Sequence, residues 1–122
     1  MTEQLIKVDT TPTFRRNLRT LAKKYRHVRS DVRPLIEQLQ AGETPGDQVP
    51  GITLTVYKVR VRNSDLQRGK SGGYRVIYYL KTDAQITLVT IYSKTEQSDV
   101  TVKDVRDFLD EYFEGGAAEL DL

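Results

Sequence analysis

The fold is decided by the stretch Tyr57-Lys-Val-Arg-Val-Arg-Asn-Ser-Asp-Leu-Gln-Arg-Gly-Lys-Ser-Gly-Gly-Tyr-Arg-Val-Ile-Tyr-Tyr79. Apolar and basic residues alternate in its first arm, the apolar set being Tyr57, Val59 and Val61 and the basic set Lys58, Arg60 and Arg62. Successive side chains of a strand point to opposite faces, so one face of this arm is apolar and the other carries three cations. The glycines between the two arms predict a β-hairpin with a long loop.

Cations continue beyond the first arm. Arg68 and Lys70 belong to the predicted loop, and Arg75 belongs to the return arm. Like charges about 7 Å apart along one strand face repel one another. A fold therefore has little structural use for such a row, whereas a site for a polyanion would use it.

Length and composition predict one domain over residues 1–122, with an ordered core at about 5–113 and a frayed tail at 114–122. The chain is 38% hydrophobic and 30% charged, which is typical of a globular protein. It has no cysteine, which excludes disulfides and thiolate sites. The sequence shows no apolar run of membrane-spanning length and no signal-peptide pattern, so we expect a cytoplasmic protein with no membrane partner.

The formal net charge of +2 conceals two parts of opposite sign. Residues 1–70 carry 14 Lys and Arg against 7 Asp and Glu, whereas residues 71–122 carry 5 against 10. The basic part suits a polyanionic partner. We interpret the acidic part as a solvated helix face and tail.

Capping signals and periodicity predict the remaining elements. Thr11 followed by Pro12 marks one helix start, and Thr101-Val-Lys-Asp104 resembles the capping box of another. Ser30 is expected to open a further helix, with Pro34 in its first turn, where no backbone donor is lost. The predicted strands are 5–8, 53–62, 73–81 and 85–92, and the predicted loop between helix and hairpin is 43–51.

This order predicts an α+β fold, a small sandwich of an antiparallel sheet with two N-terminal helices and one C-terminal helix. The strand at 85–92 is nearly all apolar or threonine, so it is expected to be the most buried. We expect the helices to cover the apolar face of the sheet. Lys58, Arg60 and Arg62 would then line the opposite, concave face.

Metal and serine catalysis are poorly supported by the sequence. The single histidine, His27, lies in a basic run and is more typical of a surface residue than of a ligand, so we predict no metal site and no cofactor. A serine triad would need a histidine partner. The acids near the C-terminal end are spaced as a polar helix face rather than as a convergent carboxylate site.

Cleavage of RNA is compatible with these residues, because RNA carries its own nucleophile, the 2′-OH, beside the scissile phosphate. Arginine can stabilise the developing charge, and lysine can act as a base where neighbouring cations favour its neutral form. Crowding by arginines makes Lys58 the candidate base, and Lys94 is a second candidate base or a phosphate ligand. Tyr74, Tyr79 and Tyr92 offer a hydroxyl and a stacking face, or alternatively pack in the core.

Three segments together resemble the RelE/ParE toxin superfamily, and most closely its RelE and HigB-like branch of type II toxin–antitoxin systems. They are Tyr57-Lys-Val-Arg-Val-Arg62, Gly73-Tyr-Arg-Val-Ile-Tyr78 and Ile91-Tyr-Ser-Lys-Thr-Glu-Gln-Ser-Asp-Val100. The resemblance covers about residues 5–113. It implies a small RelE-like α+β fold, an endoribonuclease that cleaves mRNA in the ribosomal A site without a metal, and inhibition by a cognate antitoxin.

The resemblance also implies which residues act. Lys58 and Arg60 match the family's basic pair on the first hairpin strand, Arg75 matches the arginine of its Gly-Tyr-Arg motif, and Lys94 falls in its basic segment after the last strand. These four are the predicted catalytic residues. The predicted RNA- and ribosome-binding residues are Arg62, Arg68, Lys70, Tyr79 and Tyr92.

Two positions depart from the best-known members of the superfamily. Thr95 stands where those proteins have an arginine, and Thr101 stands where they have a tyrosine that orients or stacks the substrate base. Tyr92 is a candidate substitute for that tyrosine. The hairpin loop is also longer here, and we expect Arg68 and Lys70 to reach ribosomal RNA or the mRNA backbone.

Two other functions remain open, a ParE-like toxin that binds DNA gyrase and a non-catalytic RNA-binding domain. Lys58, Arg60 and Arg75 on one surface favour the nuclease, since a protein-binding toxin would not require such a cluster. The expected partners are the 70S ribosome with its mRNA and a cognate antitoxin. We expect an acidic or amphipathic segment of the antitoxin to cover the cation row or to displace the last helix.

Overall fold

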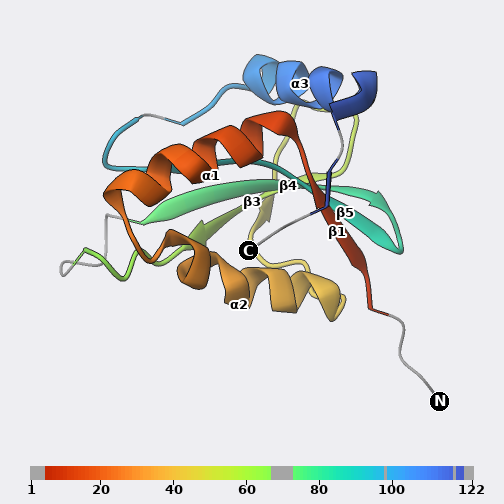
Figure 1. Cartoon of the computed structure of the whole chain (residues 1–122). Coiled ribbons are helices and arrows are strands. Elements are labelled where there is room, and N and C mark those ends of the chain that lie inside the picture. The colour runs from red at the N-terminus through yellow and green to blue at the C-terminus, as the bar shows by residue number, and fades with distance from the viewer. Residues whose placement is uncertain (1–4, 67–72, 98, 117, 120–122) are drawn as a thin grey trace.

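A computed structural model describes residues 5–66, 73–97, 99–116 and 118–119 (Figure 1). In these ranges the chain forms a six-stranded sheet in the order β2-β3-β4-β5-β1-β6. The strands are β1 Lys7–Thr10, β2 Asp47–Gln48, β3 Val56–Val61, β4 Tyr74–Thr82, β5 Gln85–Ser93 and β6 Ala118–Glu119. The helices are α1 Pro12–Lys24, α2 Val28–Gln40 and α3 Val102–Glu111, and a π-helical turn, Tyr112–Gly116, follows α3. The predicted α+β class is confirmed.

β3 and β4 form the predicted antiparallel hairpin, although its loop residues 67–72 lie outside the described residues. Gly73, just before β4, has a φ of 114°, and a Cβ there would lie 2.8 Å from the carbonyl oxygen of Val61. Only glycine therefore allows this close approach of the two arms. β4 pairs antiparallel with β5, and β1 pairs parallel with β5, so the sheet is mostly antiparallel.

α1 and α2 cover one face of the sheet. Thr11 caps α1 by accepting a hydrogen bond from the Phe14 backbone N–H, and Pro12 occupies the first helical position, as predicted. The apolar side of the first hairpin arm packs against this helical layer, as predicted. The hydrophobic cluster of this face includes Phe14, Leu18, Leu35, Leu39, Val59, Val61, Val76 and Tyr78.

α3 packs on the opposite face, so that α2 and α3 lie on opposite sides of the sheet (Figure 1). Strand alternation places Lys58 and Arg60 on the same face as Val56, which belongs to the α3 cluster. The expectation that the helices cover a single face is therefore wrong. β4 and β5 carry apolar residues on both faces, so a second layer is needed to bury them. The residues that meet Val105 and Leu109 of α3 are Val56, Ile77, Tyr79, Val89 and Tyr92.

Several boundaries differ from those predicted. β1 begins at Lys7 rather than at residue 5, and α2 begins at Val28 rather than at Ser30. Pro34 consequently lies inside α2, beyond its first turn. β2 pairs with β3 within the segment predicted to be a loop, and β6 pairs with β1 within the tail predicted to be frayed. The capping box of α3 is confirmed, with the Thr101 and Asp104 side chains each accepting from the other's backbone N–H.

A buried carboxylate fastens the end of α3 to the sheet. Asp9 of β1 is 4% exposed and accepts hydrogen bonds from Gln85 at 3.1 Å, Thr87 at 2.6 Å and Tyr112 at 2.8 Å. Lys81 donates in turn to the Tyr112 hydroxyl at 3.2 Å. We call Asp9, Gln85, Thr87 and Tyr112 the buried clasp. A buried charge is tolerated only when hydrogen bonds satisfy it, so the clasp fixes β1, β5 and the end of α3 together.

Candidate active site

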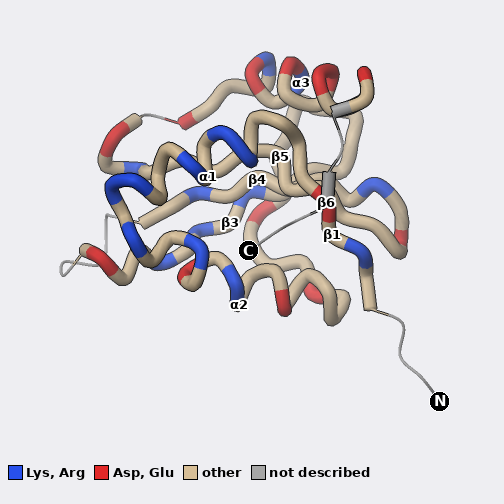
Figure 2. Tube along the Cα trace, in the orientation of Figure 1, with Lys and Arg blue, Asp and Glu red and all other residues tan. Residues whose placement is uncertain are grey.

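Basic side chains from three neighbouring strands share the face on which α3 packs. Lys58 and Arg60 come from β3, Arg75 comes from β4, and Lys94 follows directly after β5. We call these four residues the cation cluster. Figure 2 shows the basic positions along β3 and β4 and the acidic positions along α3. The acids of α3 thus lie on an element that packs on the same face as the cations of β3 and β4.

The strand register brings the two arginines together. Arg60 of β3 is directly opposite Arg75 of β4, and Arg75 is directly opposite Tyr92 of β5. Lys58 lies two residues before Arg60, on the same face, opposite Ile77. Like charges at directly opposed strand positions repel one another. The predicted convergence of Lys58, Arg60 and Arg75 on one surface is therefore present in the fold.

A carboxylate that the sequence reading did not single out lies at the centre of the lysines. Asp99, in the segment between β5 and α3, has one oxygen 3.6 Å from Lys58 Nζ and the other 3.1 Å from Lys94 Nζ. The Tyr92 hydroxyl donates to Asp99 at 2.9 Å. The Tyr92 hydrogen bond, followed by Lys94 and Lys58, holds the pKa of the Asp99 carboxyl below its ordinary value. Asp99 is therefore ionised at neutral pH.

Little in the sequence could have identified Asp99. Two acids, Glu96 and Asp99, follow β5 within a few residues, and either could have paired with a lysine. The path of the segment decides between them, because Glu96 instead lies 3.4 Å from Lys24 of α1. Lys58 was expected to be crowded by arginines, and the structure places the Asp99 carboxylate beside it as well.

The predicted tyrosines pack in the core. Tyr92 is 2% exposed and Tyr79 is 8% exposed, and both belong to the cluster beneath α3. Tyr79 also makes an edge contact with Phe113, at 6.0 Å between ring centroids. Neither ring presents a face on which an RNA base could stack. Tyr74 is fully buried on the α1–α2 side.

Tyr92 contributes through its hydroxyl rather than its ring. Burial, followed by the hydrogen bond to Asp99, raises the pKa of Tyr92 to about 12. The hydroxyl therefore stays protonated at neutral pH and donates to the carboxylate. Its role in the site is that of a fixed donor, not of a base.

The remaining predicted residues lie at the margin of the cation cluster or outside the described chain. Arg62 follows the end of β3 and is exposed. Arg68 and Lys70 lie outside the described residues. Lys94 is half-buried and meets Asp99, as described above. The structure thus brings together Lys58, Arg60, Arg75 and Lys94.

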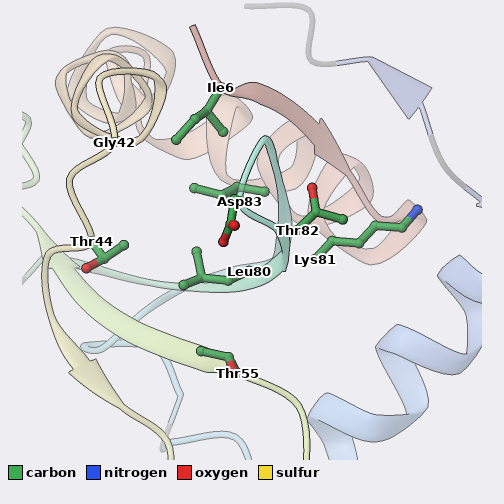
Figure 3. Close-up of a pocket in the computed structure, with 9 residues that line it drawn as sticks. Ile6, Gly42, Thr44, Thr55, Leu80, Lys81, Thr82 and Asp83 are labelled. Atoms are coloured by element: carbon green, nitrogen blue, oxygen red, sulfur yellow. The ribbon is translucent and has the colours of Figure 1, made fainter. Parts of the chain in front are cut away.

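A cavity formed by described residues lies apart from these cations. It has a volume of about 380 Å³ and is formed by the start of β1, the end of α2 and the β4–β5 turn. In the close-up, Ile6 and Leu80 face its interior, and Asp83 lies at the turn (Figure 3). The lining residues include one lysine, Lys81, whose ammonium is directed to Tyr112 of the clasp. This cavity therefore has no cluster of cations for a polyanion.

The described ranges contain no group of three or more His, Cys, Asp and Glu side chains arranged to hold a metal ion. His27 lies at the start of α2, with Nδ1 2.6 Å from an Asp65 oxygen, and its ring is half exposed. This contact, together with the hydrogen bond from the His27 backbone N–H to Asp65, ties the start of α2 to the segment after β3. Within the same ranges, no helix has the length and apolar character needed to cross a membrane.

Comparison with known proteins identifies a family for most of the chain. A family model described as the RelE toxin of the RelE/RelB toxin–antitoxin system matches residues 14–112. The matched range begins in α1 and ends directly after α3, and it includes the whole cation cluster and Asp99. A search of curated proteins found no match.

Proposed function

The chain belongs to the RelE toxin family of RelE/RelB toxin–antitoxin systems, and we propose that it is a ribosome-dependent endoribonuclease that cuts translated mRNA without a metal ion. The observation that carries the proposal is the facing pair Arg60 and Arg75, flanked by Lys58. Planar guanidinium groups match the oxygens of a phosphate and remain charged at all physiological pH values. Two of them on neighbouring strands suit a phosphoryl group whose negative charge grows during the reaction.

In the proposed reaction the 2′-oxygen of the RNA attacks the adjacent phosphorus, and the bond from phosphorus to the 5′-oxygen breaks. The 2′-hydroxyl loses its proton and the departing 5′-oxygen gains one, so the products are a 2′,3′-cyclic phosphate and a 5′-hydroxyl. We assign the stabilisation of the pentavalent phosphorus to Arg60 and Arg75, and we assign the proton transfers to Lys58. Lys94 is assigned as a further phosphate ligand.

The burial of Tyr79 and Tyr92 supports the dependence on the ribosome. RNA enzymes commonly orient a splayed base by stacking it on an aromatic ring. Both rings are covered by the α3 layer, so neither can orient the base in this arrangement. We therefore assign base positioning to the ribosome, which holds mRNA in a fixed path and thereby removes much of the entropic barrier.

The family implies an antitoxin partner. We propose that its inhibitory segment supplies carboxylates to the cation cluster or displaces α3 from the sheet. Both modes would prevent mRNA from using the site. The first would compete directly with the RNA phosphate, and the second would uncover Tyr92 and disturb its hydrogen bond to Asp99.

The test is induced expression in growing cells with mapping of mRNA 5′ ends. Wild type is compared with Lys58→Ala/Arg75→Ala and with the matched control Lys103→Ala/Arg106→Ala, which removes the same charges from the exposed side of α3. We expect growth arrest with cuts at fixed codon positions in translated messages for the wild type and for the control. The double variant at Lys58 and Arg75 should lose both at equal protein level.

Other outcomes point to the competing functions. Arrest without cuts would indicate a protein target such as DNA gyrase. Retained RNA binding without cuts or arrest would indicate a non-catalytic RNA-binding domain. Cuts that persist in untranslated RNA would contradict dependence on the ribosome.

A further inference from the structure

We propose that Asp99 is a positioning residue that holds the side chains of Lys58 and Lys94 in place for the scissile phosphate. The inference rests on the proposed nuclease function. It adds a residue between the last strand and α3 to a site otherwise built on the hairpin and the end of β5.

The contacts of Asp99 divide between its two oxygens. Oδ1 lies 3.6 Å from Lys58 Nζ and accepts the Tyr92 hydroxyl at 2.9 Å, whereas Oδ2 lies 3.1 Å from Lys94 Nζ. One carboxylate therefore joins a lysine from β3 to a lysine that follows β5. Two ammonium groups brought to one site repel each other, and a carboxylate between them offsets that repulsion.

The position of Asp99 is itself fixed from both sides. Tyr92, which donates to it, is 2% exposed and packed beneath α3. Val100 packs against the same hydrophobic cluster, and Thr101 forms the capping box of α3. The carboxylate is thus joined to residues that pack beneath α3 or cap it, although its own side chain is 48% exposed.

A fixed carboxylate gives the lysines an advantage in catalysis. A lysine side chain loses rotamer entropy when it is immobilised. Contact with Asp99 orders both lysines before RNA binds, so this cost is not met during the reaction. The gain should appear in the rate of the bound complex rather than in affinity, because a negative charge does not help to bind phosphate.

A different role would give the opposite result. A carboxylate that merely filled the empty anion site would compete with the RNA phosphate, and its removal would strengthen binding and speed cleavage. Asp99→Asn separates the two roles, since it keeps the shape of the side chain and removes its charge.

The experiment measures single-turnover cleavage on programmed ribosomes for wild type, Asp99→Asn, Asp99→Glu and the control Asp107→Asn. Asp107 is an exposed acid on α3 that pairs only with Lys103 among the contacts observed, at 2.9 Å. We expect Asp99→Asn to lower the maximal rate at least tenfold, with the half-saturating ribosome concentration unchanged or lower. Asp99→Glu should recover part of the rate, and Asp107→Asn should match the wild type.

A second readout does not depend on activity. Carboxyl NMR titration of Asp99 should show a pKa below the ordinary aspartate value, and Tyr92→Phe and Lys94→Met should each raise it. An Asp99 carboxyl that titrates normally and is insensitive to both substitutions would overturn the proposed contacts.

The outcomes distinguish this inference from the proposed function. Wild-type cleavage with an equally fast or faster Asp99→Asn variant would overturn the positioning role and leave the nuclease intact. An inactive wild type on translating ribosomes would overturn the nuclease and, with it, the catalytic meaning of Asp99.

Discussion

A carboxylate lies near each end of α3, and the two differ in burial and in the charge of their partners. At the C-terminal end, Asp9 is 4% exposed, and its observed partners Gln85, Thr87 and Tyr112 are neutral donors. Before the N-terminal end, the Asp99 side chain is 48% exposed and joins two lysines and a tyrosine. A buried carboxylate with neutral donors has no access to a ligand and serves the fold. An exposed one that gathers cations contributes little stability and is placed where an anionic ligand would bind.

The comparison predicts that the cation cluster can be altered with a large loss of cleavage and no loss of stability. Arg75→Gln should reduce cleavage on ribosomes about 100-fold or more, equivalent to about 3 kcal/mol of transition-state stabilisation. Its thermal midpoint should stay equal to that of the wild type or rise, because Arg75 faces Arg60 across the strands. Arg106→Gln on α3 is the control. A clear fall in midpoint for Arg75→Gln would show that the arginine also serves the fold.

Substitution in the buried clasp should instead reduce stability and leave cleavage intact. Asp9→Ala removes the acceptor of two buried donors and one partly buried donor, and we expect a loss of about 3 kcal/mol in the free energy of unfolding, measured with urea. Asp99→Ala, the matched exposed carboxylate, should lose less than about 1 kcal/mol. Equal losses at the two sites would remove the distinction between them. Below its unfolding transition, Asp9→Ala should still cleave mRNA.

A third test concerns Gly73, which directly precedes β4, the strand that carries Arg75. Gly73→Ala and Gly115→Ala share the strain of a positive φ, with values of 114° and 108°. A Cβ at Gly73 also meets the Val61 carbonyl, whereas one at Gly115 meets nothing within 4 Å. Gly73→Ala should therefore lose about 1–2 kcal/mol more than Gly115→Ala in urea unfolding, and it should also slow cleavage. Equal losses would show that β4 can shift to admit the methyl group.

The smallest expected effect is the pH dependence of stability at Asp99. Its folded pKa is lowered by Tyr92, Lys94 and Lys58, so its contribution is present above the unfolded value, about 3.9, and is lost as the pH falls through the folded value. The stability difference between wild type and Asp99→Asn should be small near pH 7, because the site is exposed, and should vanish in acid. Urea unfolding across this range measures it. A difference that did not change with pH would mean that the charge of Asp99 contributes nothing.

Local sequence signals were sufficient for the hairpin and the helix starts. Alternation in β3 predicts the shared face of Lys58 and Arg60, and the hydroxyl caps at Thr11 and Thr101 predict the helix starts that the structure has. These signals act over a few residues, so the sequence alone contains them. The start of α2 was missed because His27 precedes it without a side-chain cap.

The side on which α3 packs could not be read from such signals. An alternating strand shows that two faces differ, but it does not show how much of a mixed face is covered. The near-continuous apolar run of β5 indicated burial on both sides, and only the packing of Val105 and Leu109 shows which helix provides the second cover. The same packing decides that Tyr79 and Tyr92 are core residues.

The centre of the candidate site depends on contacts distant in sequence. Lys58 and Asp99 are 41 residues apart in the sequence, and the fold brings Lys58 Nζ within 3.6 Å of an Asp99 oxygen. A lone acid in a loop has no periodicity and no motif. Its role becomes visible only when its neighbours are known.

Folding itself concentrates the positive charge of β3 and β4, since the unfolded chain spreads Arg60 and Arg75 apart and the sheet sets them face to face. A polyanion will therefore act as a counterion for the folded chain far better than for the unfolded one. A ligand present at 100 times its dissociation constant would then add about 2.7 kcal/mol to stability. The lifetime of the protein in a cell should consequently depend on whether such a ligand is bound. Copies bound to ribosomal RNA or to an acidic inhibitor should resist proteases, and unbound copies should be degraded first.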